Sequence, residues 1–543
     1  MDEFTSEEQK LLGPHISSLT DSVYAITIPG IAGAAMARLS RSPKGLRRII
    51  LDEFVREGQL DPQHSVELLE RVLVGYGDDS VAQLEGAHVM CEGISNIAAK
   101  LLEDARIGVA PLEKSTRYVR FDDRNKNGEY AFYREPRIMA SEFGEAYETA
   151  LNRCFVAYGA VLERLIQFLA ILKPIAAAEY DLRGQGPERI IALSDDRLVR
   201  QFHRTYREDL RTKACDTARV LLPAATLTNV GLYGNGQAYE HMLSRLYSSS
   251  LAEANALAKD IHKALNTVIP VYVKRAGRKE YPRMTDVQMG TFVARDFFPY
   301  FDRREEEVEM IEIAHDPRQF ENQQVAAMLY AYSETSFREI LRSVECMREA
   351  RRWTIRQLYA GGRSSKRDRP GRALEWGYPL TYEILANFGI YRDLHRHRLL
   401  TQMRQSFTTR HGFDMPELIE MAGLADEVVR RRDEISDLYE KIRRHLGADV
   451  AQYVVLFGFK ARWIMGMNDR EALHMWELRT TKQGHPDYRR VCQKMHALLK
   501  QISPLRAEMM SNVDHNDYFW SRAESEARQR RKETALGIEV LEE

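Results

Sequence analysis

The residues of this chain best suited to chemistry form one short basic run. Arg392 is followed by the tripeptide Arg396-His397-Arg398, and seven residues separate Arg398 from Ser406. Like charges packed this closely cost stability, so the run calls for an anionic partner. Guanidinium groups bind phosphate, pyrophosphate and polarised carbonyl groups through directed hydrogen bonds. The run therefore indicates a binding site for such a group.

The spacing predicts that one helix positions these side chains. Arg392 and Arg396 would share a face, and Asp393, the one acid in the run, would lie a turn before Arg396. Leu394 and Leu399 would anchor the helix by apolar contacts. A solvated helix face is the simplest alternative, but such a face would carry interspersed acids.

Metal and thiol chemistry have less support. His395 and His397 are two residues apart and would point to opposing sides of a helix, which disfavours a shared metal. The cysteines contain no Cys-x-x-Cys pair, and none is near the basic run: they are Cys91, Cys154, Cys215, Cys346 and Cys492. This pattern indicates neither a disulfide framework nor a zinc site, and it favours chemistry carried by a cofactor.

The composition is typical of a globular protein with several domains. A length of 543 residues suggests two to four domains, each able to bury a core. The net charge of −1 gives no general attraction to nucleic acid or anionic membranes, so charge must act locally. The first residues are acidic, and we find no stretch long and apolar enough to span a bilayer. We expect a soluble, cytoplasmic protein without a membrane partner.

The basic run resembles the signature of the flavin-dependent thymidylate synthases. In that family, Arg-His-Arg, seven residues and Ser build the site for FAD and deoxyuridylate. Upstream, Leu380–Arg392 is similar to the family's approach helix, and downstream Asn468–Arg479 is similar to its late FAD and nucleotide segment. Because both flanks occur in order, chance is a poor explanation.

An internal comparison indicates a diverged tandem repeat. Residues 218–242 match residues 451–475 without a gap, so that Asn235 and His241 recur as Asn468 and His474. Asn468 with Glu471 also has the pattern of a helix N-cap and its capping-box partner, with Met475 in the core. A core position would be the ordinary role of His474.

The resemblance implies an α+β fold of two thymidylate synthase-like domains, each a mainly antiparallel sheet with packed helices. We place them at about residues 1–275 and 305–543, with a polar connector at 272–282. Periodicity predicts a helical insertion through roughly 142–215. The tail from Arg522 is predicted as a solvated helix or frayed end.

The two halves keep complementary parts of the family's nucleotide site. The second half holds Arg396, His397, Arg398 and Arg479, but has Phe407, Thr408 and Gln452 at its remaining positions. The first half keeps Glu113, Ser115, Thr116, Arg117 and Arg219, but carries Asp104, Ala105 and Leu246 at the others. We therefore predict an intrachain pseudo-dimer with one composite site, and Ser406 on the vacated side.

By resemblance, the arginines that grip the pyrimidine carbonyls and act in catalysis are Arg396 and Arg479. The predicted substrate-binding residues are Glu113, Ser115, Thr116, Arg117, Arg219, Asp393, Arg396 and Arg479, of which Ser115, Thr116, Arg117 and Arg219 would hold the phosphate. The predicted FAD-binding residues are Arg396, His397, Arg398, Asn468, Arg470, His474, Leu478 and His485, with Asn235 and His241 as weaker candidates.

The implied reaction is the reductive methylation of dUMP to dTMP by a flavoprotein of nucleotide biosynthesis. Methylenetetrahydrofolate would give the carbon, reduced FAD the hydride, and NADPH would recharge the flavin. The family forms tetramers, so a homodimer of this tandem chain would supply four domains. Nucleic acid is not an expected partner.

Two alternatives remain open. Asp393 stands where the family usually has Gln, and it could accept a hydrogen bond from a cytosine amino group, or pair with Arg392 or Arg396. If Asp393 contacts the nucleotide in this way, the chain could be a flavoenzyme acting at C5 of another pyrimidine nucleotide. A non-catalytic nucleotide or nucleic-acid binder is the second alternative, supported by the basic loop 361–372.

Overall fold

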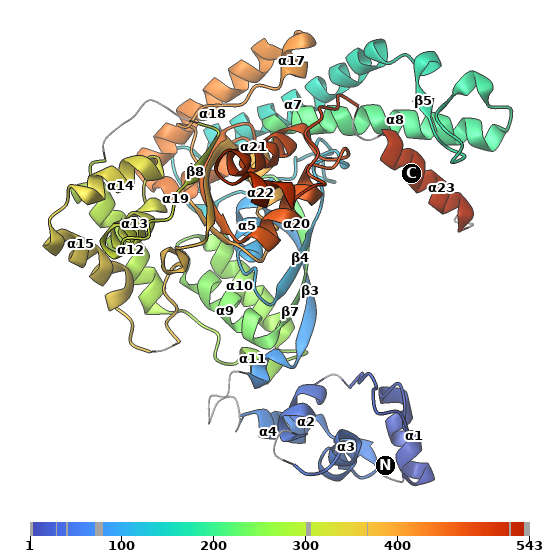
Figure 1. Cartoon of the computed structure of the whole chain (residues 1–543), viewed down its shortest axis with the longest axis vertical. Helices are drawn as coiled ribbons and strands as arrows, with labels where there is room; N and C mark the ends of the chain where they lie inside the picture. Colours follow the sequence, from blue (N-terminus) through green and yellow to red (C-terminus); the bar gives the residue numbers. More distant parts are fainter. Residues whose placement is uncertain are drawn as a thin grey trace. The chain divides into compact units, whose positions relative to one another are not determined.

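A computed structural model describes residues 4–28, 30–39, 42–70, 80–299, 306–365, 367–520 and 523–536 (Figure 1). The chain forms two compact units, and neither is continuous in sequence. Unit 1 consists of residues 1–92, 101–113 and 229–283, and unit 2 of residues 93–100, 114–228 and 284–543. These units follow spatial packing rather than the repeat, so the predicted domain boundaries stay a prediction.

Unit 1 holds most of a three-stranded sheet and the N-terminal helices. The strand order is β3 (Gly86–Ser95), β7 (Leu227–Asn235), β4 (Val109–Glu113), and β4 is antiparallel to β7. The helices are α1 (Ser6–Leu12), α2 (Ala32–Leu39), α3 (Leu46–Glu53), α4 (Pro62–Leu69), α9 (Gly236–Ser248), α10 (Ala252–Leu265) and α11 (Pro270–Val273).

Unit 2 is built around a four-stranded antiparallel sheet. The strand order is β10 (Thr401–Arg404), β11 (Lys460–Met467), β9 (Leu380–Asn387), β8 (Val308–Ile311). Every residue of β9 is buried, in contrast to the alternation of a half-exposed strand. Burial on both faces requires cover from both sides.

Helices supply that cover. On one face, β10 and β11 join a core with α12 (Glu280–Asp296), α13 (Pro317–Tyr330), α14 (Phe337–Glu345) and α15 (Glu349–Arg356). On the other face, Tyr382 of β9 packs edge-on against Trp476 and donates its hydroxyl to the Met495 carbonyl. These two partners belong to α20 (Asp469–Arg479) and α21 (Pro486–Ile502).

Strand order repeats between the two sheets. β3-β7-β4 in the first half corresponds to β9-β11-β10 in the second, and β7 and β11 each lead into a capped helix. Asn235 caps α9 through the Ala238 amide at 2.9 Å, and Asn468 caps α20 through the Glu471 amide at 3.0 Å. The predicted N-cap at Asn468 is thus confirmed, as is the burial of Met475.

The equivalent segments that follow residues 218 and 451 pair with each other in unit 2. Pro223 forms an antiparallel bridge with Leu456, its own counterpart 233 positions later in the ungapped match. The Ala224 amide donates to the Val455 carbonyl at 2.8 Å, and the reciprocal bond runs from the Phe457 amide to the Leu222 carbonyl at 2.9 Å. The contacts around this bridge are therefore related by a local two-fold symmetry.

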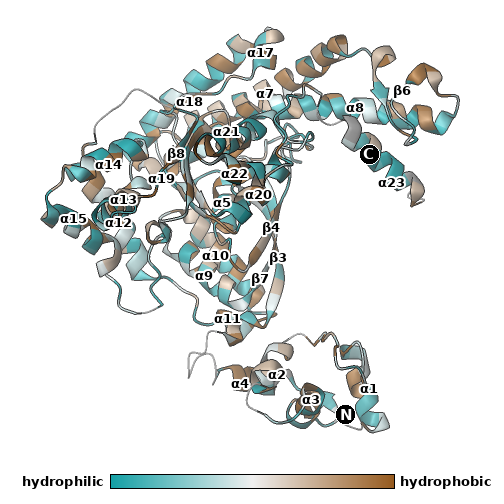
Figure 2. Ribbon diagram, viewed as in Figure 1, coloured by the Kyte–Doolittle hydropathy of each residue, from teal (hydrophilic) through white to brown (hydrophobic). Residues whose placement is uncertain are grey.

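The predicted helical insertion is confirmed by α7 (Gly144–Leu172) and α8 (Asp196–Ala218). By length and composition α7 could cross a membrane, so the expectation that no stretch would meet this criterion was wrong. Figure 2 shows both hydrophobic and hydrophilic residues along α7. Its buried face packs on α8 and α18 (Ala425–Leu446), and Arg153 pairs with Glu434 of α18 at 2.8 Å. A core helix meets the same criterion.

Two smaller predictions need correction. The stretch 272–282 is not simply a connector, because α11 ends and α12 begins within it. The tail helix α23 (Ala523–Ala535) is not only solvated: Ala527 is buried, and the guanidinium of Arg530 pairs with Glu208 of α8. Both segments are polar in composition but contain buried side chains, Tyr272 and Val273 in the first and Ala527 in the second.

Candidate functional site

The basic run lies at the end of a short helix rather than within one. α16 (Phe388–Leu394) begins at the Asn387 cap, and the chain then turns at Arg396 before entering β10. Gln402 of β10 donates its side-chain amide to the carbonyls of His395 at 3.0 Å and His397 at 3.3 Å. The prediction of a helix through the whole run was wrong because β10 pairs with β11 and redirects the chain.

The turn separates side chains that a helix would have aligned. Arg392 donates to the Thr116 hydroxyl at 2.8 Å and lies over the Phe457 ring, whereas Arg396 pairs with Asp393 at 3.1 Å. Leu394 is buried as predicted. Leu399 is 73% exposed, so its predicted anchoring role was wrong.

Asp393 is the centre of the buried charges. One carboxylate oxygen accepts from both terminal nitrogens of Arg219, at 3.1 and 3.2 Å, and the other accepts from Arg396. Burial by itself would raise the pKa of the Asp393 carboxyl, but Arg219 and then Arg396 hold that pKa well below its usual range. Gly389 makes room for this pair, since a Cβ there would lie 3.2 Å from the Arg219 guanidinium.

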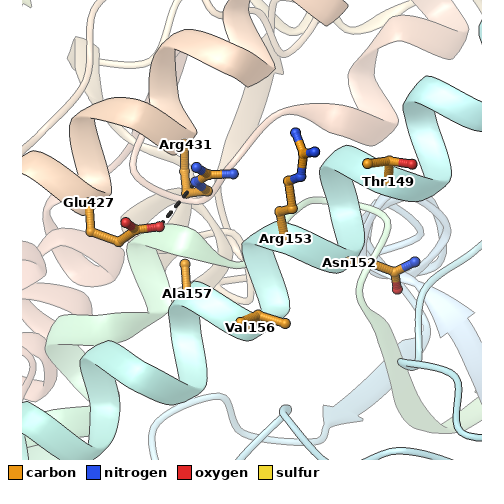
Figure 3. Close-up of a pocket in the computed structure, with 7 residues that line it drawn as sticks. All are labelled: Thr149, Asn152, Arg153, Val156, Ala157, Glu427 and Arg431. Atoms are coloured by element: carbon orange, nitrogen blue, oxygen red, sulfur yellow. Dashed lines mark ion pairs between the residues drawn. The ribbon is translucent and has the colours of Figure 1, made fainter.

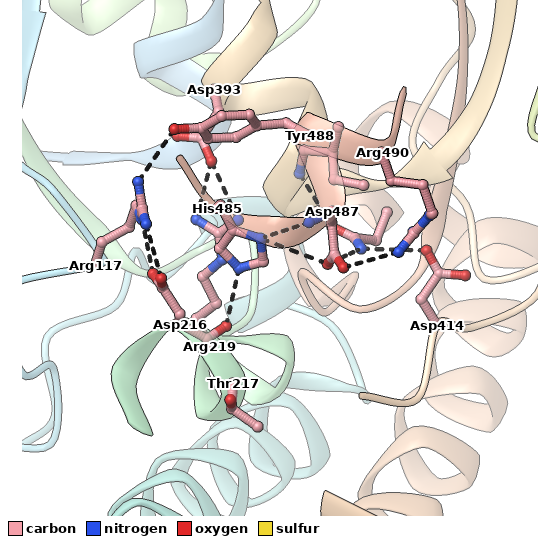
Figure 4. Close-up of polar contacts among 12 residues, drawn as sticks. Arg117, Asp216, Thr217, Arg219, Asp393, Asp414, His485, Asp487, Tyr488 and Arg490 are labelled. Carbon is pink, nitrogen blue, oxygen red and sulfur yellow. Dashed lines mark hydrogen bonds and ion pairs between the residues drawn. The ribbon is translucent and has the colours of Figure 1, made fainter. Parts of the chain in front are cut away.

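Arg117 is held by a second buried aspartate (Figure 4). Its Nε and Nη2 each donate to Asp216 at 2.8 Å, and its Nη1 donates to the Tyr488 hydroxyl at 3.2 Å. Burial by itself would raise the pKa of the Asp216 carboxyl, but its cationic neighbours, Arg117 foremost, lower it. Arg117 and Arg219 of the first half therefore lie with Asp393 and Tyr488 of the second half inside unit 2.

His485 is buried among the same groups, at 5% exposure. It caps α21 by accepting the Asp487 amide on Nδ1, so its Nε2 is the nitrogen that donates to the Asp216 carbonyl at 3.3 Å. Burial and the nearby Arg219 lower the pKa of His485, which favours the neutral ring. These contacts give His485 a structural role, and its predicted flavin contact stays a prediction.

His397 links the basic turn to α20. Its Nδ1 lies 3.0 Å from Glu471 Oε1, and its Nε2 accepts from Arg479 Nε at 2.9 Å. The Arg479 guanidinium also lies over the Tyr488 ring, 5.6 Å from its centre. Burial lowers the pKa of His397, so the imidazole is neutral at physiological pH.

The predicted cofactor residues of α20 share one exposed face. Arg470, His474 and Leu478 recur every four residues and are exposed, and Asn468 is exposed at the N-terminus of the helix. The His474 ring lies edge-on to His397 with centres 5.8 Å apart. The ordinary interpretation of His474 as a core residue was therefore wrong.

The other predicted residues are placed as follows. Ser115 accepts the Arg117 amide at 3.2 Å, Arg398 is exposed, and Ser406 is half-buried. In unit 1, Glu113 is buried at the end of β4, Asn235 caps α9, His241 is half-buried, and Leu246 is buried. Asp104, also in unit 1, accepts from Arg245 at 3.1 Å.

Sequence reasoning missed Tyr488, Asp216 and Gln402 and assigned Glu471 only to the helix cap. Tyr488 and Arg117 are separated by 371 positions, so no local pattern could reveal their contact. The one available signal was charge: Asp216 precedes Arg219 by three residues within an otherwise apolar and basic stretch.

A pocket lies elsewhere, between α7 and α18 (Figure 3). It has a volume of about 470 Å³ and is lined by Thr149, Asn152, Arg153, Val156, Ala157, Glu427 and Arg431. None of the predicted site residues belongs to it. Among the described residues, no group of three His, Cys, Asp or Glu side chains could hold a metal ion.

The fold and the site define an α+β protein in which arginines from distant parts of the chain surround buried carboxylates. Its sequence matches the family model described as thymidylate synthase complementing protein over residues 30–271 and 319–505. The chain therefore belongs to that family, and the two matched regions confirm the predicted tandem form.

The chain is similar to several relatives over nearly their whole length. A UPF0159 protein of Chlamydia muridarum is 31% identical over 547 residues, covering 97% of this chain and 99% of its own length. A UPF0159 protein of Chlamydia pneumoniae is 31% identical and covers 97% and 98%. A third, from Thermoplasma acidophilum, is 31% identical and covers 91% and 98%.

Proposed function

We propose that this chain is an FAD-dependent thymidylate synthase with one composite site formed by its two halves. It methylates dUMP reductively to dTMP, with methylenetetrahydrofolate and NADPH as co-substrates. The observation that carries the proposal is the contact of Arg219 with Asp393, which joins the first-half arginine to the Arg-His-Arg turn. Family membership supports the reaction class.

The pseudo-dimer is supported by the reciprocal backbone bonds around Pro223 and Leu456. In an isologous interface, equivalent residues meet at the two-fold axis, so a residue there is expected to pair with its own repeat counterpart. Gln452, the counterpart of Arg219, accepts the Phe407 amide at 3.0 Å. This contact agrees with the prediction that the second half no longer binds phosphate at this position.

Phosphate recognition falls to Ser115, Thr116, Arg117 and Arg219. Asp216 and Asp393 stabilise the two buried arginines, because a guanidinium removed from water without a counter-charge is costly. Arg392 fixes Thr116 through its hydroxyl. The phosphate adds to this network through charge-assisted hydrogen bonds.

Arg396 and Arg479 act on the pyrimidine. Both are partly exposed, so they remain accessible to a ligand while Asp393 and His397 hold them. Positive charge directed at the ring carbonyls stabilises negative charge that develops at C5 or C6. Removing one such donor costs on the order of 3 kcal/mol in activation free energy.

The exposed face of α20 fits a flavin. Arg470 and His474 offer donors for phosphate or ring oxygens, and Leu478, at 49% exposure, offers an apolar surface. FAD, when bound there, supplies the hydride. The buried His397 borders this face through its ring contact with His474, and the next residue, Arg398, is exposed.

The alternatives gain no support from the contacts. Asp393, the reason for considering another pyrimidine nucleotide, is engaged by two arginines. In the basic loop, Asp368 accepts the Ser364 and Ser365 amides, and Arg372 donates to the Gln402 carbonyl. These contacts give the loop a role in supporting β10. A cytoplasmic homodimer completes the proposal.

The first experiment is a visible spectrum of the purified protein, followed by titration with dUMP and dCMP. We expect a yellow protein whose flavin bands shift with dUMP, at one nucleotide per chain, and which forms dTMP when folate and NADPH are added. A colourless protein that binds neither FAD nor dUMP would contradict the proposal.

A further inference from the structure

Glu471, His397 and Arg479 form one chain of contacts. Glu471 and Arg479 lie on α20, and the imidazole of His397 bridges them through its two nitrogens at 3.0 and 2.9 Å. Glu471 and His397 are buried, whereas Arg479 is partly exposed. The buried Glu471 and His397 therefore fix the accessible guanidinium of Arg479.

The contact with Arg479 determines where the imidazole proton lies. A guanidinium can only donate, so His397 Nε2 must be unprotonated to accept from Arg479 Nε. The single proton of the neutral ring is then on Nδ1, where Glu471 accepts it. A carboxylate that fixes a histidine tautomer through one nitrogen controls what the other nitrogen can bind.

We propose that Glu471 is a positioning residue, which acts through neutral His397 to hold Arg479 toward the pyrimidine. This inference rests on the proposed function, because it assigns the pyrimidine to Arg479. Without the carboxylate, the ring is free to carry its proton on Nε2. That proton would face the Arg479 N–H and remove the contact that orients the guanidinium.

The same geometry makes the site sensitive to acid. The charged and titratable groups facing His397 are Glu471, Arg479 and His474, all of α20. Burial lowers the pKa of His397, while Glu471 opposes that change and Arg479 adds to it. When pH falls through this lowered pKa, Nε2 gains a proton, and dUMP affinity decreases.

A double-mutant cycle on dUMP affinity, measured by calorimetry, tests the positioning role. We expect E471Q to bind within about threefold of wild type, because the Gln carbonyl still accepts from Nδ1. E471M and R479M should each weaken binding roughly tenfold, and the double variant no further than R479M. E477M on the same helix is the matched control, since the Glu477 carboxylate accepts the Asn512 amide at 3.2 Å. Additive losses, or E471Q as weak as E471M, would overturn the proposal.

A crystal structure of E471M separates this inference from the proposed function. If wild type binds no dUMP, the proposed function fails, but the contact between Arg479 and His397 remains measurable. We expect the 2.9 Å contact to be lost in E471M and kept in E477M. An Arg479 side chain unchanged in E471M would show that Glu471 does not position it.

Discussion

Arg219 and Asp393, 174 positions apart, form a nearly buried ion pair at 3.1 Å within unit 2. Arg219 follows α8 of the first half, and Asp393 lies in α16, immediately before the Arg-His-Arg turn. The second oxygen of Asp393 binds Arg396. One carboxylate thus connects an arginine assigned to the phosphate with one assigned to the pyrimidine.

Asp393→Asn should destabilise the protein by about 3 kcal/mol, because two arginines lose their buried counter-charge. The pKa of Asp393 is lowered on folding, so its contribution is present above the unfolded pKa and is lost as pH falls through the folded pKa. Urea unfolding at several acidic pH values measures this. The exposed Asp123→Asn is the control. Equal stability of D393N and wild type at neutral pH would count against the network.

Gln402→Leu should loosen the Arg396–His397 turn. The variant removes the amide that bonds the carbonyls of His395 and His397, at a cost of about 1–3 kcal/mol in unfolding free energy. We expect weaker dUMP binding together with this loss of stability. Denaturant unfolding and calorimetry test both effects, and full affinity in Q402L would contradict the role given to Gln402.

Tyr488→Phe should weaken dUMP binding severalfold while leaving FAD occupancy unchanged. The substitution removes the hydroxyl that accepts from Arg117, a loss of about 1 kcal/mol, but keeps the ring beneath Arg479. Tyr488→Leu removes both contacts and should be the weaker binder. Indistinguishable affinities for the two variants would show that the ring contributes nothing.

Arg470→Ala and His474→Ala should reduce FAD content without changing the thermal midpoint, because both side chains are exposed on α20. Flavin absorbance per protein after purification measures the occupancy. The core variant Met475→Ala should do the opposite, lowering stability by about 2–5 kcal/mol. Normal FAD content in both surface variants would show that FAD does not bind to this face.

Local patterns predicted the local structure well. The Asn468 cap, the buried Met475 and the helical insertion each depend on residues close in sequence. The end of α16 could not be predicted in this way, since Gln402 and the pairing of β10 with β11 decide it. A basic run at helical spacing is ambiguous when a strand begins soon after it.

The sequence named residues for the site but not the contacts that hold them. Arg117 lies in unit 2 against Asp216 and Tyr488, and neither of these partners was named. A buried charge requires a counter-charge or hydrogen-bond partner, but such a partner can lie far away in sequence, where no spacing predicts it. His474 was predicted to bind FAD by resemblance, and its exposure on α20 could not be predicted from its type alone, because a lone histidine is more often a core residue.

The central claim is that both halves of the chain build one nucleotide site, and dUMP affinity in single variants tests it most directly. Arg117→Ala and Arg219→Ala should weaken dUMP binding as much as Arg396→Ala, about 100-fold if each removes a charged donor. Ser406→Ala should stay within a few-fold of wild type. Unchanged affinity in R117A together with lost binding in S406A would contradict the composite site.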